Sequence, residues 1–217
     1  MRRLSVVTLA LLLALPLRAA AHPHVFVDAT LEILFDAEGR AEAVRIGWTY
    51  DPLFSMTYLA EQGLDADFDG ILTAEEEAQL AGFDMNWAEG FEGDTYALLG
   101  EQPIALSRPE QPTATVREGS LVSTHLRRLA VPVLPIGQEL VVQVYDPSFY
   151  TSYIIAATPV LTGRSDCRVQ VFEPDREAAD ARLQAALEEL AGSADVETEF
   201  PAIGSAYAEE ARVSCAS

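Results

Sequence analysis

V-F-V-D-A-T-L-E-I-L-F, residues Val25–Phe35, decides the fold of this chain. Apolar side chains recur there at every second position, with Asp28, Thr30 and Glu32 between them. Successive side chains of a strand point to opposite faces, so this period of two predicts a β-strand with one buried face. Residues 36–39 are typical of a turn, and residues 43–50 form a second apolar segment. Together they predict a β-hairpin.

A short helix is expected directly after the hairpin, over residues 52–62. Asp51 can accept hydrogen bonds from the free amides of the first turn, and proline is well tolerated at the first helical position, here Pro52. Gly63 follows the last helical residue, where a left-handed conformation commonly ends a helix.

The next segment has the pattern of an EF-hand calcium loop, D-A-D-F-D-G-I-L-T-A-E-E over residues 65–76. An EF-hand loop takes its ligands from positions one, three, five, seven, nine and twelve, with glycine at position six. The expected calcium ligands are therefore Asp65, Asp67, Asp69, the carbonyl of Ile71, Thr73 and Glu76. A helix is expected from Thr73 to about Trp87. The alternative is an acidic turn that binds no metal.

The remainder of the chain predicts a β body. Short apolar runs between Gly and Pro turns indicate strands over residues 95–99, 104–106, 113–117, 121–131, 139–145, 152–160 and 165–172. Apolar positions near helical spacing predict a helix over 174–190, and 204–217 predict a short helix and a last strand. The predicted class is α+β: a mainly antiparallel β body, a helical EF-hand-like insertion near residues 52–88 and a C-terminal helix. Residues 22–217 form one domain, or two if a second subdomain begins at about residue 91.

A secretory leader is expected at residues 1–21. Arg2 and Arg3 precede an apolar run over residues 4–17, and Ala19 and Ala21 fit an A-x-A cleavage site. No later stretch approaches the ~20 apolar residues of a membrane-spanning helix. The sequence thus predicts a periplasmic or secreted protein without a membrane span.

Cleavage after Ala21 would make His22 the first residue, two positions before His24. The α-amine and two imidazoles are nitrogen donors that suit Zn, Ni, Co or Cu. His125 is the last of the 3 histidines and the natural candidate for a third ligand. Pro23 lacks an amide N–H, which blocks the square-planar mode that needs deprotonated backbone amides. Ordinary surface histidines at a frayed terminus are the alternative.

The charge of the chain limits the kinds of partner it can bind, and its cysteines bear on the compartment in which it folds. The chain has 34 acidic against 14 basic residues, which argues against nucleic acid as a partner. In an oxidising compartment the 2 cysteines, Cys167 and Cys215, are expected to form a disulfide that ties the C-terminal tail to the body.

One internal similarity relates two turns. Residues 50–54 read Y-D-P-L-F and residues 145–149 read Y-D-P-S-F. One interpretation is that Asp51 and Asp146, with Tyr150, face a shared pocket. The alternative is that both aspartates cap turns.

These motifs together resemble the DUF1007 family. The resemblance rests on H-P-H-V-F-V-D at residues 22–28, the two Y-D-P turns, the D-x-D-x-D-G loop and the terminal cysteines, and it covers nearly the whole mature chain. It implies an exported bacterial protein, a periplasmic component of a transport system. Members tend to be encoded near nickel/cobalt-type transporters, which implies transition-metal handling. It carries over no established active site.

Three functions are compatible with the sequence. The first is a periplasmic accessory protein that buffers or delivers Zn, Ni, Co or Cu for a membrane transporter, with a separate structural calcium site. The second is a copper oxidoreductase in which the N-terminal histidine forms a histidine brace. The third is a calcium-stabilised interaction module with no transition metal. No Ser-His-Asp set and no glycine-rich phosphate loop is present, so an enzyme is the less favoured class.

Overall fold

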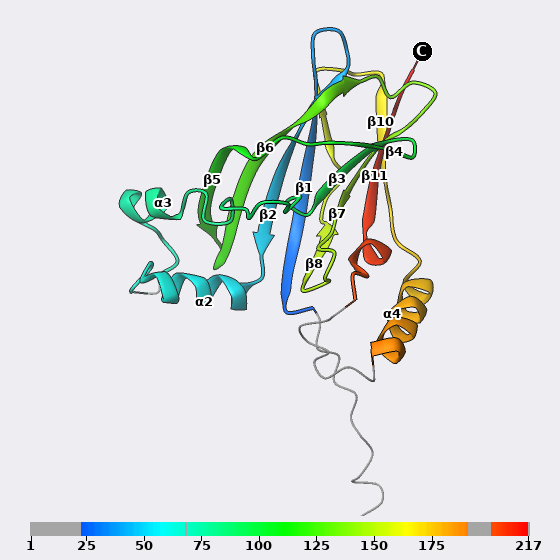
Figure 1. Ribbon diagram of the computed structural model, residues 1–217. Coiled ribbons are helices and arrows are strands. Elements are labelled where there is room, and N and C mark those ends of the chain that lie inside the picture. Colours follow the sequence, from blue (N-terminus) through cyan, green and yellow to red (C-terminus); the bar gives the residue numbers. More distant parts are fainter. Residues whose placement is uncertain (1–22, 68, 191–200, 217) are drawn as a thin grey trace, which may run out of the picture.

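The computed structural model describes residues 23–67, 69–190 and 201–216 and contains two β-sheets (Figure 1). Sheet A has the order β5 (Glu110–Arg117), β6 (Ser120–Val133), β2 (Ala41–Tyr50), β1 (Val25–Phe35) and β8 (Thr151–Ile155), and β9 (Val160–Thr162) also pairs with β1. Sheet B has the order β10 (Cys167–Phe172), β11 (Glu209–Cys215), β7 (Leu140–Val144), β3 (Thr95–Leu99) and β4 (Gln102–Ile104). Neighbouring strands are antiparallel, except that β1 runs parallel to β8 and β9.

The alternating strand β1 organises the core, and the predicted hairpin with β2 is confirmed. Every second residue of β1 is buried, from Val25 to Phe35. These side chains meet those of sheet B in one hydrophobic cluster, whose members include Val27, Leu31, Ile33, Leu140, Val142, Val144, Ala211 and Val213. Burial of this apolar area is the main stabilising term of the fold. The predicted α+β class with a mainly antiparallel β body is therefore confirmed.

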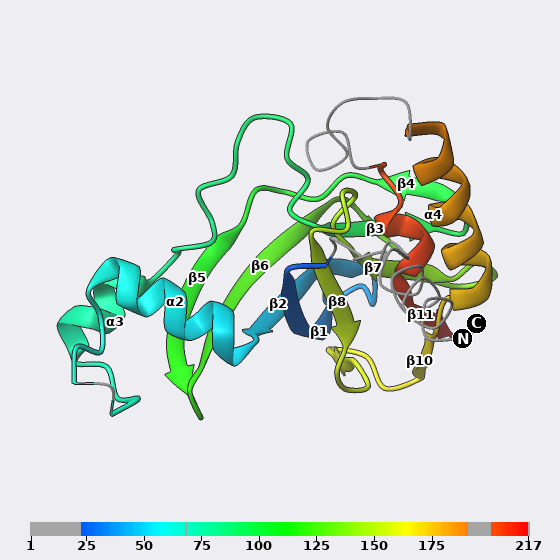
Figure 2. The same ribbon diagram turned by 90° about the horizontal axis from the view of Figure 1, so that it is seen from below.

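Three α-helices and one short 3-10 helix are described outside the sheets. They are α2 (Pro52–Gln62), α3 (Ala74–Leu80), α4 (Arg176–Leu190) and η1 (Gly204–Tyr207). Helices α2 and α3 lie at the β5 side of sheet A, and α4 lies with η1 at the other side (Figures 1 and 2). The start and end of α2 are as predicted: Asp51 accepts a hydrogen bond from the Phe54 amide at 2.9 Å, and Gly63 has a φ of 68°.

Two predicted elements differ most from the structure in their extent. The helix expected from Thr73 to about Trp87 ends at Leu80, because Gly82 has a φ of 76° and the chain turns away there. The single strand expected over 152–160 is two strands, β8 and β9. Pro159, which cannot donate to a sheet ladder, separates them.

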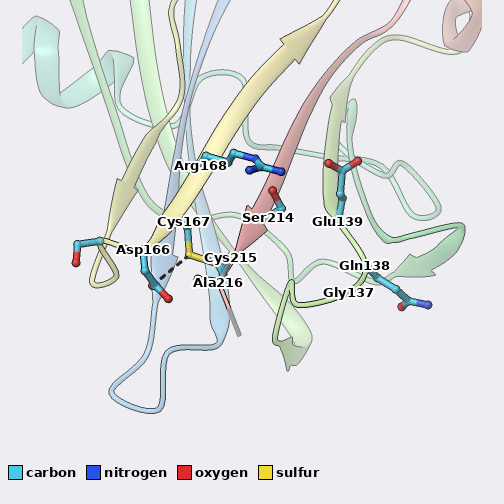
Figure 3. Close-up of a pocket in the computed structure, with 10 residues that line it drawn as sticks. Gly137, Gln138, Glu139, Asp166, Cys167, Arg168, Ser214, Cys215 and Ala216 are labelled. Atoms are coloured by element: carbon cyan, nitrogen blue, oxygen red, sulfur yellow. Dashed lines mark hydrogen bonds between the residues drawn. A yellow bond between two sulfur atoms is a disulfide. The ribbon is translucent and has the colours of Figure 1, made fainter.

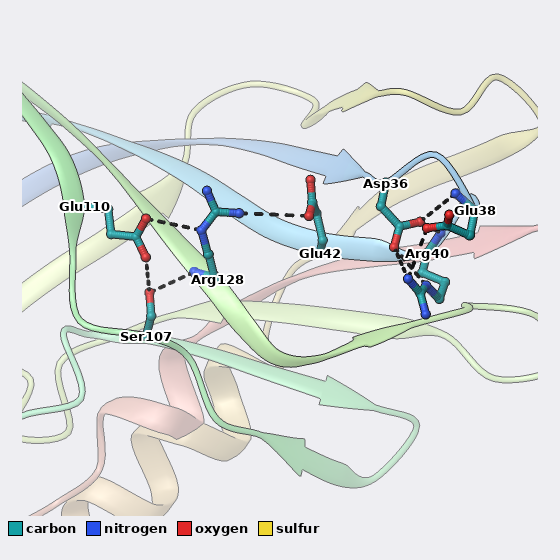
Figure 4. A network of polar contacts seen from close by, with 7 residues as sticks. All are labelled: Asp36, Glu38, Arg40, Glu42, Ser107, Glu110 and Arg128. Carbon is teal, nitrogen blue, oxygen red and sulfur yellow. Dashed lines mark hydrogen bonds and ion pairs between the residues drawn. The ribbon is translucent and has the colours of Figure 1, made fainter.

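Polar contacts fasten the solvent face of the strands around β6 (Figure 4). Arg128 pairs with Glu110 at 3.2 Å and with Glu42 at 3.9 Å, and its amide donates to the Ser107 hydroxyl. The side chains of all three ion-pair partners are substantially exposed, so each pair stabilises by no more than about 1 kcal/mol.

Candidate functional sites

The acidic loop brings its first three aspartates together. One carboxylate oxygen from each of Asp65, Asp67 and Asp69 lies within 4.8 Å of the others, the one such group of acidic, His or Cys side chains among the described residues. The Gly70 amide donates to Asp65 Oδ1 at 3.2 Å, which folds the loop back on its first residue. A hollow of about 530 Å³ is lined by Ala66, Asp67, Asp69, Ile71, Leu72, Thr73 and Glu76.

The donor set of this loop fits calcium, which prefers carboxylate and carbonyl oxygens. Glu76 is engaged elsewhere in this arrangement. Its Oε1 accepts from the Asp65 amide at 3.0 Å, and its Oε2 accepts from the Thr73 amide at 2.8 Å. These hydrogen bonds lower the pKa of Glu76, and the one from the Thr73 amide has the largest effect. Glu76 is therefore ionised. The hollow is lined by five of the six expected ligands: Asp67, Asp69, Ile71, Thr73 and Glu76. The sixth, Asp65, accepts the hydrogen bond from the Gly70 amide.

The start of β1 is held between the two Tyr-Asp-Pro turns. Asp51 Oδ2 accepts from the Phe26 amide at 3.0 Å, and Asp146 Oδ2 accepts from the Thr151 amide at 3.0 Å. Thr151 is the register partner of Val25. Both aspartates therefore act as caps whose oxygens bind backbone amides, as the alternative interpretation had it, and the hydrogen bonds give no support to a shared pocket.

His24 lies at this corner, and His22 lies outside the described residues. The His24 amide donates to the Tyr150 carbonyl at 2.8 Å, and the two rings are 4.8 Å apart between centroids. The His24 side chain is exposed. The structure thus places Tyr150 beside His24.

His125 lies far from His24, the one N-terminal histidine that the structure describes, so the geometry does not support the expectation that His125 is a third ligand. It pairs in register with Ile46, which pairs with Leu31. Leu31 is seven positions along β1 from His24, so at about 3.3 Å per residue the two histidines are roughly 20 Å apart. His125 is fully buried between Trp48 and Trp87, with ring centroids at 4.8 and 5.7 Å. Burial, assisted by Arg127, lowers its pKa to about 3.

The sequence did not predict a cluster of polar side chains on the inner face of sheet A. Asp84 accepts hydrogen bonds from the Tyr50 hydroxyl at 2.8 Å and from the Ser123 hydroxyl. Asp94 accepts from the Tyr153 hydroxyl at 2.9 Å. All buried side-chain N and O atoms without a hydrogen-bond partner in the described parts of the chain belong to this neighbourhood: Trp48 Nε1, Asp84 Oδ1, Asp94 Oδ1, Thr95 Oγ1 and both ring nitrogens of His125. We call these residues, with Tyr50, Ser123, Tyr153 and Arg127, the inner polar cluster.

Burial dominates the electrostatics of the inner polar cluster. It raises the pKa of Asp94 to about 7 and raises the pKa of Asp84, in both cases against the hydrogen bonds that favour the ionised forms. Two sequence motifs could have indicated this cluster: W-T-Y-D-P, which contains Tyr50, and Y-D-P-S-F-Y-T-S-Y, which ends in Tyr153.

The expected disulfide is present. Cys167 and Cys215 face each other in register on β10 and β11. Both cysteines line a hollow of about 620 Å³ together with Asp166, Arg168 and Ser214. Figure 3 shows these lining residues.

These features define the class: an α+β protein of two sheets, with an acidic loop, a histidine at the start of β1 and one disulfide. Residues 7–215 match the family model described as "Protein of unknown function (DUF1007)", and the chain belongs to that family. No curated protein matches the chain. Among the described residues, no helix combines the length and apolar character that a membrane crossing requires.

Proposed function

We propose that this protein is an exported metal-binding accessory protein that holds calcium in the loop 65–76 and a transition metal at its N-terminus, for a membrane transporter. The convergence of Asp65, Asp67 and Asp69 within 4.8 Å, with the Gly70 amide bonded back to Asp65, carries the metal-binding part of the proposal. Calcium would bind this loop in the folded protein and not in the unfolded chain, and it would therefore stabilise the fold by mass action.

The N-terminal part rests on the anchored corner. The backbone of His24 is fixed by Tyr150, and β1 begins one residue later, so a metal at His22 and His24 would be held against the sheet. His22 would contribute its amine and imidazole, and His24 its imidazole. Zn, Ni, Co and Cu are the metals that such nitrogen donors bind.

The test is a metal titration of the mature protein starting at His22, with calcium, magnesium, Zn, Ni, Co and Cu followed by calorimetry. We expect calcium binding that is lost in Asp65→Asn with Asp67→Asn and kept in the control Asp28→Asn, which removes one exposed charge of β1. We expect transition-metal binding that is lost in His22→Ala with His24→Ala.

A second version of the mature protein, with two residues added before His22, moves the α-amine away from the imidazole. Weaker transition-metal binding in that version would support chelation by the terminal amine. Calcium binding without any transition-metal binding would leave the calcium-stabilised interaction module as the function. Oxygen consumption by the copper-loaded protein with a reductant would favour the oxidoreductase, for which His125 is not available as a partner of His24.

A further inference from the structure

The segment 81–94 covers the inner polar cluster and is fastened to sheet A by titratable side chains. It joins α3 to β3 and contains no helix or strand. Near its start Asp84 binds Tyr50 of β2 and Ser123 of β6, and at its end Asp94 binds Tyr153 of β8. We call this segment the cover loop.

Arg127 of β6 also binds the cover loop, through the backbone. Its guanidinium donates to the Glu92 carbonyl and to the Thr95 carbonyl, the latter at 3.2 Å. It lies over the Trp87 ring at 5.0 Å from the centroid. Arg108 binds the cover loop as well: its guanidinium donates to the Trp87 carbonyl at 2.6 Å and lies 5.4 Å from the centroid of the Trp87 ring. His125 is neutral at neutral pH, and Arg127 is the cation that acts on Asp94.

The buried Asp94 carboxylate fits a proton better than a metal ion. Asp84, Asp94 and His125 do not bring three ligand atoms within 4.8 Å of one another, whereas Asp65, Asp67 and Asp69 do. A divalent ion would also lie in the field of the Arg127 guanidinium. A proton on Asp94 makes this buried group neutral.

We propose that Asp94 is a proton-binding clasp for the cover loop: with Asp94 protonated the loop lies closed on sheet A, and closure weakens as the pH rises towards neutrality. The unpartnered Oδ1 atom and the almost complete burial of Asp94 carry the inference, because a buried carboxylate is far more easily accommodated in its neutral form. The proposal does not depend on the metal sites.

The groups that face the clasp set the direction of the pH dependence. Burial raises the pKa of Asp94 to about 7, with a further rise from Asp146 and opposing effects from Tyr153 and Arg127. Burial, with Asp94 adding to it, raises the pKa of Tyr96 and of Tyr145, so these rings are also neutral.

Around Asp84, Ser123 and Tyr50 donate hydrogen bonds, and Tyr58 of α2 is close enough for Asp84 to raise its pKa. Ionisation therefore occurs on the carboxylates first. The closed state holds the extra proton, and closure weakens as pH rises towards about 7.

The test is hydrogen–deuterium exchange of peptides within 81–94, from about pH 5 to about pH 9, corrected for the intrinsic pH dependence of exchange. We expect protection in the native protein to fall by up to about tenfold per pH unit between about pH 5 and pH 7, where only the closed state holds the proton, and to level off above pH 7. In Asp94→Asn, which cannot ionise, protection is expected to be independent of pH. The control Glu89→Gln, an exposed carboxylate on the same loop, is expected to behave like the native protein.

Tyr153→Phe keeps the fold testable if Asp94→Asn is unstable. It removes the hydrogen bond that favours ionised Asp94, so protection is expected to level off at a higher pH than in the native protein. The same fall in Asp94→Asn as in the native protein, or constant protection in the native protein, would overturn the proposal. Peptides from β1 serve as the internal reference, and failure of the metal titrations would leave these results unaffected.

Discussion

The Tyr50 hydroxyl donates to Asp84 Oδ2 at 2.8 Å, across 34 residues of chain. Tyr50 is the last residue of β2, directly before the Asp51 cap of α2, and Asp84 follows α3. This one hydrogen bond therefore closes the base of the whole segment that carries the acidic loop.

Tyr50→Phe is expected to lower the free energy of unfolding by about 1.5–3 kcal/mol, because a hydrogen bond to a carboxylate is lost and its buried oxygen loses a donor. Urea denaturation measures this. Tyr58→Phe is the control, since the Tyr58 hydroxyl makes no hydrogen bond to side chains or backbone among the described residues, and a change within about 0.5 kcal/mol is expected there. Equal effects of the two substitutions would show that the hydrogen bond between Tyr50 and Asp84 does not stabilise the fold.

The pH dependence of stability should show two opposing contributions. The pKa of Asp94 is raised from 3.8 to about 7 in the fold, so its contribution is greatest below pH 3.8 and is lost as pH rises through 7. The pKa of His125 is lowered from 6.5 to about 3, so its contribution is present above pH 6.5 and is lost as pH falls towards 3. The two slopes, each at most about 1.4 kcal/mol per pH unit, nearly cancel between about pH 4 and pH 6.5.

Substitution separates these contributions. Asp94→Asn should leave a protein whose stability rises with pH from about 4 to about 6.5, and His125→Phe should leave one whose stability falls over the same range. Denaturation midpoints at several pH values measure both slopes. Parallel profiles for native and substituted proteins would contradict the assignment.

Gly93 should not tolerate a side chain. A Cβ at this position would collide with the Trp87 ring, and its φ of 67° disfavours other residues. We expect Gly93→Ala to destabilise by about 2–4 kcal/mol, from steric overlap and backbone strain together. Gly90→Ala is the matched control: it has a φ of 83° but no neighbour within 4 Å, so about 1 kcal/mol is expected. Thermal unfolding followed by tryptophan fluorescence compares them.

Removal of the disulfide should weaken the fold without abolishing it. The bond closes a 48-residue separation, for which the chain-entropy model gives about 4 kcal/mol. Two other contacts hold the last strand without the disulfide: the β10–β11 ladder, and the hydrogen bond that the Cys215 amide donates to the Pro135 carbonyl. Cys167→Ser with Cys215→Ser is expected to unfold at lower denaturant with an unchanged far-ultraviolet circular dichroism spectrum. A loss of the β signal would show that the ladder needs the disulfide.

The sequence predicted the features that depend on neighbouring residues. Alternation in β1, the Asp51 cap and Gly63 follow from local geometry, and the Asp65, Asp67 and Asp69 convergence follows from loop spacing. The inner polar cluster depends on contacts between distant segments: Tyr153 and Asp94 are 59 residues apart, and Asp94 lies in an irregular segment with no periodic pattern. The distance of His125 from His24 was not predicted, because a strand pattern gives the face of a residue but not its distance from the end of another strand.

The position of β1 also determines the order in which the chain can assemble. β1 is near the N-terminus, yet its parallel partners begin at Thr151 and Val160. A chain that emerges N-terminus first therefore exposes one hydrogen-bonding edge of its central strand until most of the sequence has followed. Closing such distant contacts is slow, and the waiting edge is a template for pairing with other chains. We therefore expect the late arrival of β8 and β9 to slow folding, and dilution or a holding chaperone to improve the yield.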